Sequence, residues 1–466
     1  MTSTRRERED SRRRSGRRRR KRVKINYTRL LISAIIVLVV LFLLIRGVSA
    51  LIGGGDKPKS PTTEKDTKST SESKETSSSE TEKINSESEE LLPLTTEQKA
   101  ADIQFVKDLI NKSHPYFPIL IEDKKVDWET VTKTYEEKAL AAANDSEYSR
   151  IMSEWIRQLG DPQTNLLSYD YYQYLHKKYQ ESSKQPWLEV LQAPQVKKRY
   201  ESMQSEEIDN AQPDENAVSA PGTITMEKAV EGQLAYVRIP QFTEAHIAED
   251  AAVIRSFLES VQDYPHLVFD LRGNNEGVNM YWIKNIVSPL ISLDHMLTGR
   301  IALRDQSFQA FMDDSLKNKN NYIKFGDFFP INELPSELSV PTVIKESFEG
   351  YRRFDLTVIP DSPIAYEGTI YILQDKDTYG AADTLAQFAK STGFATVIGT
   401  TSRGFGMTAE LEPALLSLPN SGLVLRMPFT VGLDYNGAIT TQSGTTPDIE
   451  INKEILSPSE LIDFLR

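Results

Sequence analysis

The chain has 466 residues, more than one ordinary domain needs, and this length permits a sizeable hydrophobic core. It contains no cysteine, which excludes disulfides, thiol catalysis and cysteine-ligated metal sites. Residues 1–29 hold fourteen Lys and Arg against three acidic residues, a net charge of +11, whereas the whole chain carries −12 and the remainder therefore −23. This asymmetry favours a membrane or nucleic-acid contact at the basic end.

The basic segment leads directly into an apolar one. Residues 30–45 are apolar apart from Ser33, and extension to Ile52 gives about the twenty residues that a bilayer span requires. The positive-inside rule then predicts a cytoplasmic tail over 1–29, a single transmembrane helix over 30–52 and an extracellular remainder at the cell membrane. Because residues 48–50 are also typical of a signal-peptidase site, cleavage after Ala50 stays open.

Nucleic acid is not the expected partner of the basic tail. No aromatic residue precedes Tyr27, and attraction to anionic lipid headgroups is sufficient to explain the charge. The absence of cysteine in an exported chain favours a bacterial surface. Residues 53–93 are predicted to be a disordered linker, since Ser, Thr, Glu and Lys make up most of them and little apolar surface could be buried.

Order is predicted to return with a helical domain over residues 94–221. Thr95 or Thr96 begins a helix that ends before Pro115. Further helical patterns run over 127–143, over 146–159 with an apolar face that includes Trp155, and from 169 to about 205. A polar stretch over 206–220 closes the domain.

Short β-rich runs alternate with helices over residues 222–466. The pattern predicts strands over 234–239, 266–271, 369–373 and 395–398, and helices over 248–261 and 381–390. This alternation indicates an α/β fold with helices packed on a sheet. Residues 296–360 are polar and rich in Phe, and we interpret them as an insertion or cap near the site.

Four motifs occur in the order known from one peptidase family. They are Tyr236 to Pro240, Phe269 to Gly277, Ala395 to Gly399 and Gly444 to Ile449. On these motifs, residues 95–466 resemble the tail-specific, or C-terminal processing, serine peptidases. The resemblance implies a crotonase-like α/β catalytic domain preceded by the helical domain. The family's peptide-binding PDZ module is not apparent in residues 165–222.

The resemblance places the family's catalytic residues on unsuitable side chains. The nucleophilic Ser aligns with Gly380, the Lys base with Phe405, and the family's Glu with Asp383. Branches without the Lys carry a His in a Gly-Asp-Gly-His-Thr segment, where this chain has Gln163. A hydroxyl at Thr378 or Ser402 is the fallback nucleophile, although neither has a general base at a recognisable spacing.

A Gly-rich turn after the strand 266–271 is the candidate oxyanion site. The backbone N–H groups of Gly273 and Gly277 could stabilise a developing oxyanion there. In the alternative interpretation, the turn only connects a strand to the next element. The predicted peptide-binding residues beside it are Tyr379, Gly380, Ala381 and Arg403, the last as a carboxylate ligand. We expect no metal and no cofactor, and we interpret the five histidines as structural, with His246, His266 and His295 in surface turns.

The sequence therefore leaves three functional hypotheses. The preferred one is a membrane-anchored pseudo-peptidase that binds a peptide or a protein C-terminus by strand addition. The alternative is an active serine-type peptidase with rearranged catalytic residues. The third is a structural protein of the cell wall in which the α/β domain is a platform.

Overall fold

The computed structural model describes residues 92–124, 127–204, 223–275, 277–317, 322–451 and 457–465. The predicted cytoplasmic tail (1–29), the predicted transmembrane helix (30–52) and all but the end of the predicted linker (53–93) lie outside these residues. Within the described ranges, no helix combines the length and the apolar character that crossing a bilayer requires. The described residues belong to one compact unit that begins at Glu87.

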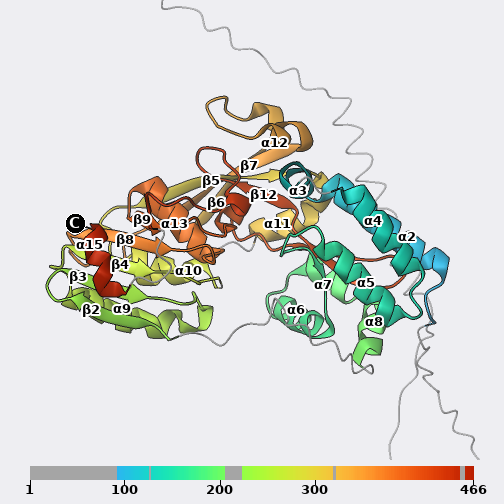
Figure 1. The fold of residues 1–466 in the computed structure, drawn as a ribbon, viewed down its shortest axis with the longest axis horizontal. Coiled ribbons are helices and arrows are strands. Elements are labelled where there is room, and N and C mark those ends of the chain that lie inside the picture. The colour runs from blue at the N-terminus through green and yellow to red at the C-terminus, as the bar shows by residue number, and fades with distance from the viewer. Residues whose placement is uncertain are drawn as a thin grey trace, which may run out of the picture. The chain divides into compact units, whose positions relative to one another are not determined.

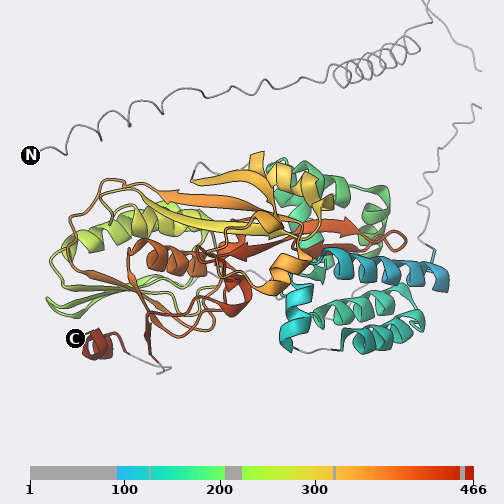
Figure 2. The ribbon, with the colours of Figure 1, turned by 90° about the horizontal axis from the view of Figure 1, so that it is seen from above.

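Seven helices form the amino-terminal part of this unit (Figure 1). They are α2 (Thr96–Ser113), α3 (Phe117–Lys124), α4 (Trp128–Leu140), α5 (Asp145–Arg157), α6 (Tyr169–Glu181), α7 (Gln185–Leu191) and α8 (Pro194–Gln204). Figure 2 shows the blue helix α2 alongside α4 and α5. The predicted helices are confirmed, and Thr95 caps α2 by accepting a hydrogen bond from the Gln98 backbone N–H. The segment predicted to be helical over 169–205 is divided, because Pro186 and Pro194 are suited to helix starts.

A six-stranded sheet carries the candidate site at the carboxyl ends of its strands. Its order is β13 (Ile449–Glu450), β9 (Thr396–Gly399), β8 (Thr369–Gln374), β4 (His266–Asp270), β3 (Leu234–Arg238) and β2 (Thr225–Val230). All neighbours are parallel except β2 and β3. Helices α9 (Ile247–Ser260), α10 (Asn279–Trp282) and α13 (Ala381–Thr392) share a core with one face, whereas α15 (Ile462–Leu465) packs on the other. Coverage of both faces explains why these strands read as continuous apolar runs.

A second, antiparallel sheet was not predicted. Its order is β12 (Thr430–Leu433), β5 (His295–Leu303), β7 (Gly350–Val358) and β6 (Ile323–Pro330), with α11 (Gln309–Lys317) and α12 (Thr342–Ser347) between its strands in the chain. Most of the segment interpreted as an insertion or cap, 296–360, therefore consists of sheet and its connections. Leu297, Ile301 and Phe354 place this sheet in the same core as α13.

A third, small sheet joins the helical region to the α/β region. It consists of β1 (Asn165–Leu166), β11 (Val424–Met427) and β10 (Ala414–Ser417), and a short α14 (Thr440–Ser443) follows later in the chain. The buried Trp187 indole donates to the Pro413 carbonyl at 2.7 Å, and the Arg199 guanidinium donates to the Ser421 carbonyl at 2.7 Å. A mixed α/β fold with a helical amino-terminal region is thus confirmed, and its crotonase-like class stays a prediction.

Candidate peptidase-type site

Loops from three parallel strands meet at the carboxyl edge of the six-stranded sheet. The Tyr379 N–H donates to the Asn274 carbonyl at 2.9 Å, which joins the loop after β8 to the turn after β4. The Gly380 N–H donates to the Gly404 carbonyl at 3.0 Å, which joins the same loop to the one after β9. This edge is where open parallel sheets bind ligands. The structure thus brings together the three segments that the sequence singled out.

Gly380 occupies a sharp turn at the start of α13. Its backbone has φ +59° and ψ −118°, a conformation that strains any residue with a side chain. A Cβ added there would meet no atom within 4 Å. The position that the resemblance assigns to the nucleophile is therefore roomy and sharply turned, but it carries no group that can attack a carbonyl. Ala381 follows as the first residue of the helix.

Phe405, at the position assigned to the Lys base, is enclosed by apolar side chains. Only 7% of it is exposed. Its ring centroid lies 5.1 Å from that of Tyr379 and 5.6 Å from that of Tyr116. Side chains from α3, α12, β5 and β12 complete this cluster, among them Leu120, Ile344, Ala302 and Val431. A packed aromatic ring thus stands at the position where the resemblance would place a base.

Gln163, at the position that the resemblance assigns to an alternative His, lies at the site. Its side-chain amide donates to the Tyr379 hydroxyl at 3.4 Å, one residue before Gly380. The only well-buried imidazole nearby, among the described residues, is His114, with Nε2 2.8 Å from Thr164 Oγ1 and Nδ1 accepting from the Phe117 N–H at 3.1 Å. Burial alone would raise the pKa of Asp161, but its hydrogen bond to His114 lowers that pKa below the ordinary value. His114 is therefore structural, as predicted.

Two other histidines lie where the sequence did not place them. His266 and His295 begin strands β4 and β5, so the prediction of surface turns was wrong for both. Each histidine is the first residue of its strand and precedes an apolar run. A single polar residue at the start of a strand cannot be distinguished from a turn residue by its sequence pattern. His246 does lie in a short 3-10 turn before α9.

Thr378 is an unsuitable fallback nucleophile because it is fully buried. Its hydroxyl lies 3.1 Å from both the Leu271 carbonyl and the Asp375 carboxylate, and it accepts a hydrogen bond from the Asp375 N–H at 3.0 Å. These contacts hold the loop between β8 and α13 in place. They leave no free direction for attack on a substrate.

Ser402 differs, because its hydroxyl donates to the carboxylate of Asp383. No base lies at a recognisable sequence spacing from Ser402, yet the fold brings the carboxylate of Asp383, 19 residues away, into contact with it. Burial raises the pKa of Asp383, although hydrogen bonds from Ser402 and Thr445 oppose this rise. Ser402 is 6% exposed and Asp383 is fully buried, so the pair is closed to substrate in this structure. The signal in the sequence was the match of Asp383 to the family's Glu.

The structure explains the two glycines of the predicted oxyanion turn by local backbone contacts. The Gly273 N–H donates to the Asp375 carboxylate at 3.0 Å and is not directed at an open site. Gly277 has φ +120° and pairs with Phe242 so closely that a Cβ would collide with the Phe242 carbonyl. The turn thus fits the connecting role left open by the sequence.

Asp270 and Arg272, at the end of β4, have a structural role as well. Asp270 is fully buried and accepts hydrogen bonds from Arg272 Nε at 2.9 Å and Nη2 at 2.7 Å. The Tyr236 hydroxyl also donates to this carboxylate. Since the charge of Asp270 is matched by a bidentate guanidinium, the pair fixes the strand end and leaves no free base.

Arg403 is exposed at the surface of the site. Its guanidinium carbon lies 5.4 Å from the ring centroid of Tyr379, a cation–π geometry. Burial raises the pKa of Tyr379 to about 12, so this phenol stays protonated at neutral pH. Across the described residues, no cluster of three or more His, Asp and Glu side chains is arranged to hold a metal ion.

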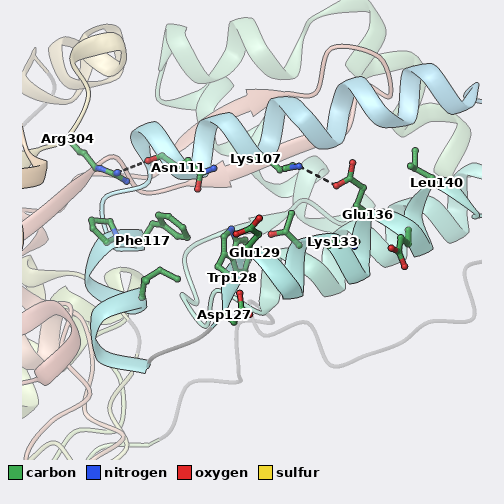
Figure 3. A pocket seen from close by; sticks show the side chains of 14 residues that line it. Lys107, Asn111, Phe117, Asp127, Trp128, Glu129, Lys133, Glu136, Leu140 and Arg304 are labelled. Atoms are coloured by element: carbon green, nitrogen blue, oxygen red, sulfur yellow. Dashed lines mark hydrogen bonds and ion pairs between the residues drawn. The ribbon is translucent and has the colours of Figure 1, made fainter.

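A separate groove lies in the helical region (Figure 3). Its volume is about 1110 Å³, and it runs between α2, α3 and α4 over the apolar side chains of Phe117, Ile121 and Trp128. An ion pair between Lys107 and Glu136, 3.3 Å long, spans it. None of its lining residues belongs to the predicted site, so the groove and the candidate site are distinct.

The comparisons with known proteins agree with the motifs. Residues 233–451 match the model of peptidase family S41, in agreement with the predicted resemblance to the tail-specific peptidases. Similar solved structures include mature CPAF (13% identity, TM-score 0.45, 76% of this chain and 92% of that chain). The photosystem II D1 C-terminal processing protease is another (13% identity, TM-score 0.39, 78% of this chain and 95% of that chain). A third is a lipoprotein from Streptococcus agalactiae (13% identity, TM-score 0.41, 80% of this chain and 97% of that chain).

Proposed function

We propose that this protein is a pseudo-peptidase of family S41 that binds peptides or protein C-termini without cleaving them. One observation carries the proposal: position 380 is a glycine at the start of α13, with open space where a nucleophile would stand. Two further positions agree with it. Phe405 and Gln163 cannot accept the proton that an attacking hydroxyl must lose.

Peptide binding is supported by what remains at the carboxyl edge of the sheet. Gly380 leaves room for a main chain to approach the turn, and Arg403 and Tyr379 present polar and aromatic groups beside it. An extended peptide that pairs with exposed backbone groups gains affinity from main-chain hydrogen bonds and tolerates many sequences. Relatives in the family act on peptides or protein C-termini, which makes these the proposed ligands.

An active serine-type peptidase is the second candidate, and the Ser402–Asp383 pair favours it. The hydroxyl and the carboxylate are in direct hydrogen-bond contact, as nucleophile and base must be. Ser402 also accepts from the Thr445 N–H at 2.7 Å, so it is held from two sides. Catalysis through this pair would require an opening of the chain that exposes both residues.

A cleavage assay with the full-length chain in mild detergent separates the two candidates. Denatured envelope proteins would be incubated with the wild type, with Ser402→Ala, and with Ser391→Ala as a control from the surface of α13. We expect no cleavage by any of them, while fluorescent peptides bind measurably. Cleavage that survives in Ser391→Ala and disappears in Ser402→Ala would establish the peptidase instead.

We also propose that the chain is anchored in the cell membrane by residues 30–52, with residues 1–29 in the cytoplasm and the peptidase-type region outside. The support is the charge and hydropathy of the sequence. Resistance to carbonate extraction, together with digestion of the carboxyl-terminal part by protease added to intact cells, is the expected result. A soluble fraction holding the whole chain, uncleaved, would contradict the anchor.

A further inference from the structure

Two arginines lie near Tyr379. The Arg403 guanidinium carbon lies 5.4 Å from the Tyr379 ring centroid. Arg426 Nη1 donates to the Gln163 carbonyl at 3.1 Å, and the Gln163 amide reaches the Tyr379 hydroxyl at 3.4 Å. Both guanidinium groups act electrostatically on Tyr379. Two positive charges therefore converge on one phenol beside Gly380.

Neither arginine has an ion-pair partner among the residues that the structure describes. Carboxylates nearby are bound to other groups. Asp161 contacts His114 at 3.2 Å, and Glu412 contacts Lys178 at 3.3 Å and Lys184 at 3.6 Å. The positive charge of the two arginines is therefore available to an acidic ligand.

The arrangement continues onto helix α6 as a strip of alternating cationic and aromatic groups. The Arg426 guanidinium carbon lies 6.0 Å from the Tyr171 ring centroid, and Tyr171 stacks on Tyr174 at 5.9 Å. Tyr174 is 51% exposed, so this end of the strip is open to solvent. We name these residues the arginine–tyrosine strip: Arg403, Tyr379, Gln163, Arg426, Tyr171 and Tyr174.

We propose that the arginine–tyrosine strip binds an extended polypeptide segment through its acidic side chains, with one carboxylate at Arg403 and the next at Arg426. In an extended chain, residues i and i+2 point to the same side about 6.6 Å apart, so a Glu-x-Glu segment presents two carboxylates together. Each guanidinium can take a carboxylate in two parallel hydrogen bonds. The tyrosine rings offer flat amphipathic surfaces to the flanking residues.

A single C-terminal carboxylate fits this surface less well, because it would satisfy one arginine and leave the other unpaired. The inference rests on the proposed function, since it names the class of peptide that the site selects. It assigns specificity to charged side chains within the ligand. Strand addition alone would give no such preference.

Fluorescence polarisation with the full-length chain in detergent tests the inference. The probes are three ten-residue peptides of one sequence: Glu-x-Glu with a free C-terminus, its Gln-x-Gln counterpart, and Glu-x-Glu with an amidated C-terminus. We expect the Glu-x-Glu peptide to bind roughly tenfold to a hundredfold more tightly than Gln-x-Gln, with amidation making no difference. Arg403→Gln should remove most of this preference, so that the affinities for Glu-x-Glu and Gln-x-Gln become similar.

Matched variants keep the result interpretable. Arg255→Gln, on the surface of α9 where Arg255 pairs with Glu259 at 2.9 Å, should bind all three peptides like the wild type. Arg426→Gln should resemble Arg403→Gln; if it unfolds, the exposed Arg403 decides the question alone. Equal affinity for Glu-x-Glu and Gln-x-Gln would overturn the inference while leaving peptide binding intact. A loss of affinity on amidation, with no effect of Gln, would assign the strip to a terminal carboxylate. Absence of binding to every probe would remove the proposed function as well.

Discussion

Gly380→Ser is the most informative single change, because it restores a hydroxyl at the position assigned to the nucleophile. A Cβ there meets no atom within 4 Å, so no steric clash is expected. The cost comes from the backbone, whose φ of +59° and ψ of −118° are sparsely populated by residues with side chains. Such strain typically costs about 1–3 kcal/mol, and we expect the free energy of unfolding to fall by that amount.

The same variant should gain no peptidase activity, since a hydroxyl without a base remains a weak nucleophile. Urea denaturation followed by tryptophan fluorescence measures the stability, and cleavage of denatured envelope proteins measures the activity. Gly393→Ser is the matched control: it lies at the other end of α13, has φ +72° and equally open space, and should cost about 1–2 kcal/mol. Rapid peptide cleavage by Gly380→Ser would refute the reasoning, because it would reveal a base that the structure does not place there. A loss far above 3 kcal/mol would show that the space at Gly380 is not open.

Three further changes test the surroundings of the site. Asp383 accepts hydrogen bonds from Ser402 and Thr445 on one carboxylate oxygen and from the Gly406 N–H on the other, so the NH2 group of an asparagine would face at least one donor. Asp383→Asn should therefore lower the free energy of unfolding by about 1–3 kcal/mol in urea denaturation, and unchanged stability would count against the buried carboxylate. Burial raises the pKa of Asp305, but hydrogen bonds from Ser113 and Ser307 outweigh it and lower the pKa to about 2. The ionised Asp305 carboxylate therefore stabilises the fold above pH 3.8, and this stabilisation is lost as the pH falls toward 2. Asp305→Asn should make the free energy of unfolding less sensitive to pH between these values. A pH profile of stability identical to that of the wild type would contradict the assignment. Trp187→Ala should lower the free energy of unfolding by about 3–5 kcal/mol, because the buried indole links the helical and α/β regions. The control Tyr174→Ala, at an exposed position, should lower it by less than about 0.5 kcal/mol. Similar losses in urea denaturation of both variants would contradict this role of Trp187.

Local signals were sufficient for helices such as α2, α4 and α5 and for the four parallel strands β3, β4, β8 and β9. Thr95 and its partner Gln98 mark the start of α2 within four residues, and strands such as β4 are apolar because both faces of their sheet are covered. The second sheet gave no such signal. Its strands β5 and β7 pair across about fifty intervening residues, and β7 alternates charged residues such as Arg353 with buried ones such as Phe354. One solvated face therefore made the segment look like an insertion.

The sequence located the site's three loops but not the contacts among their side chains. The bond between Gln163 and Tyr379 joins positions 216 residues apart, and that between Ser402 and Asp383 joins positions 19 apart. Such pairs depend on how the sheet and the helical region pack. The hydrogen bond from Gly273 to Asp375 also links two loops, and it could not be read from the Gly-rich turn alone.

Glycine at position 380 and phenylalanine at position 405 are physically compatible with each other. A lysine at position 405 would place an ammonium among Tyr116, Tyr379 and the apolar side chains around them. Burial of this kind lowers a lysine pKa by up to about 3–5 units, which suits a general base but destabilises the folded state by about 1.4 kcal/mol per unit at neutral pH. That cost is useful only when a nucleophile is present to be deprotonated. With glycine at 380, phenylalanine at 405 avoids this cost and adds aromatic contacts, which favours a stable fold over proton transfer at this position.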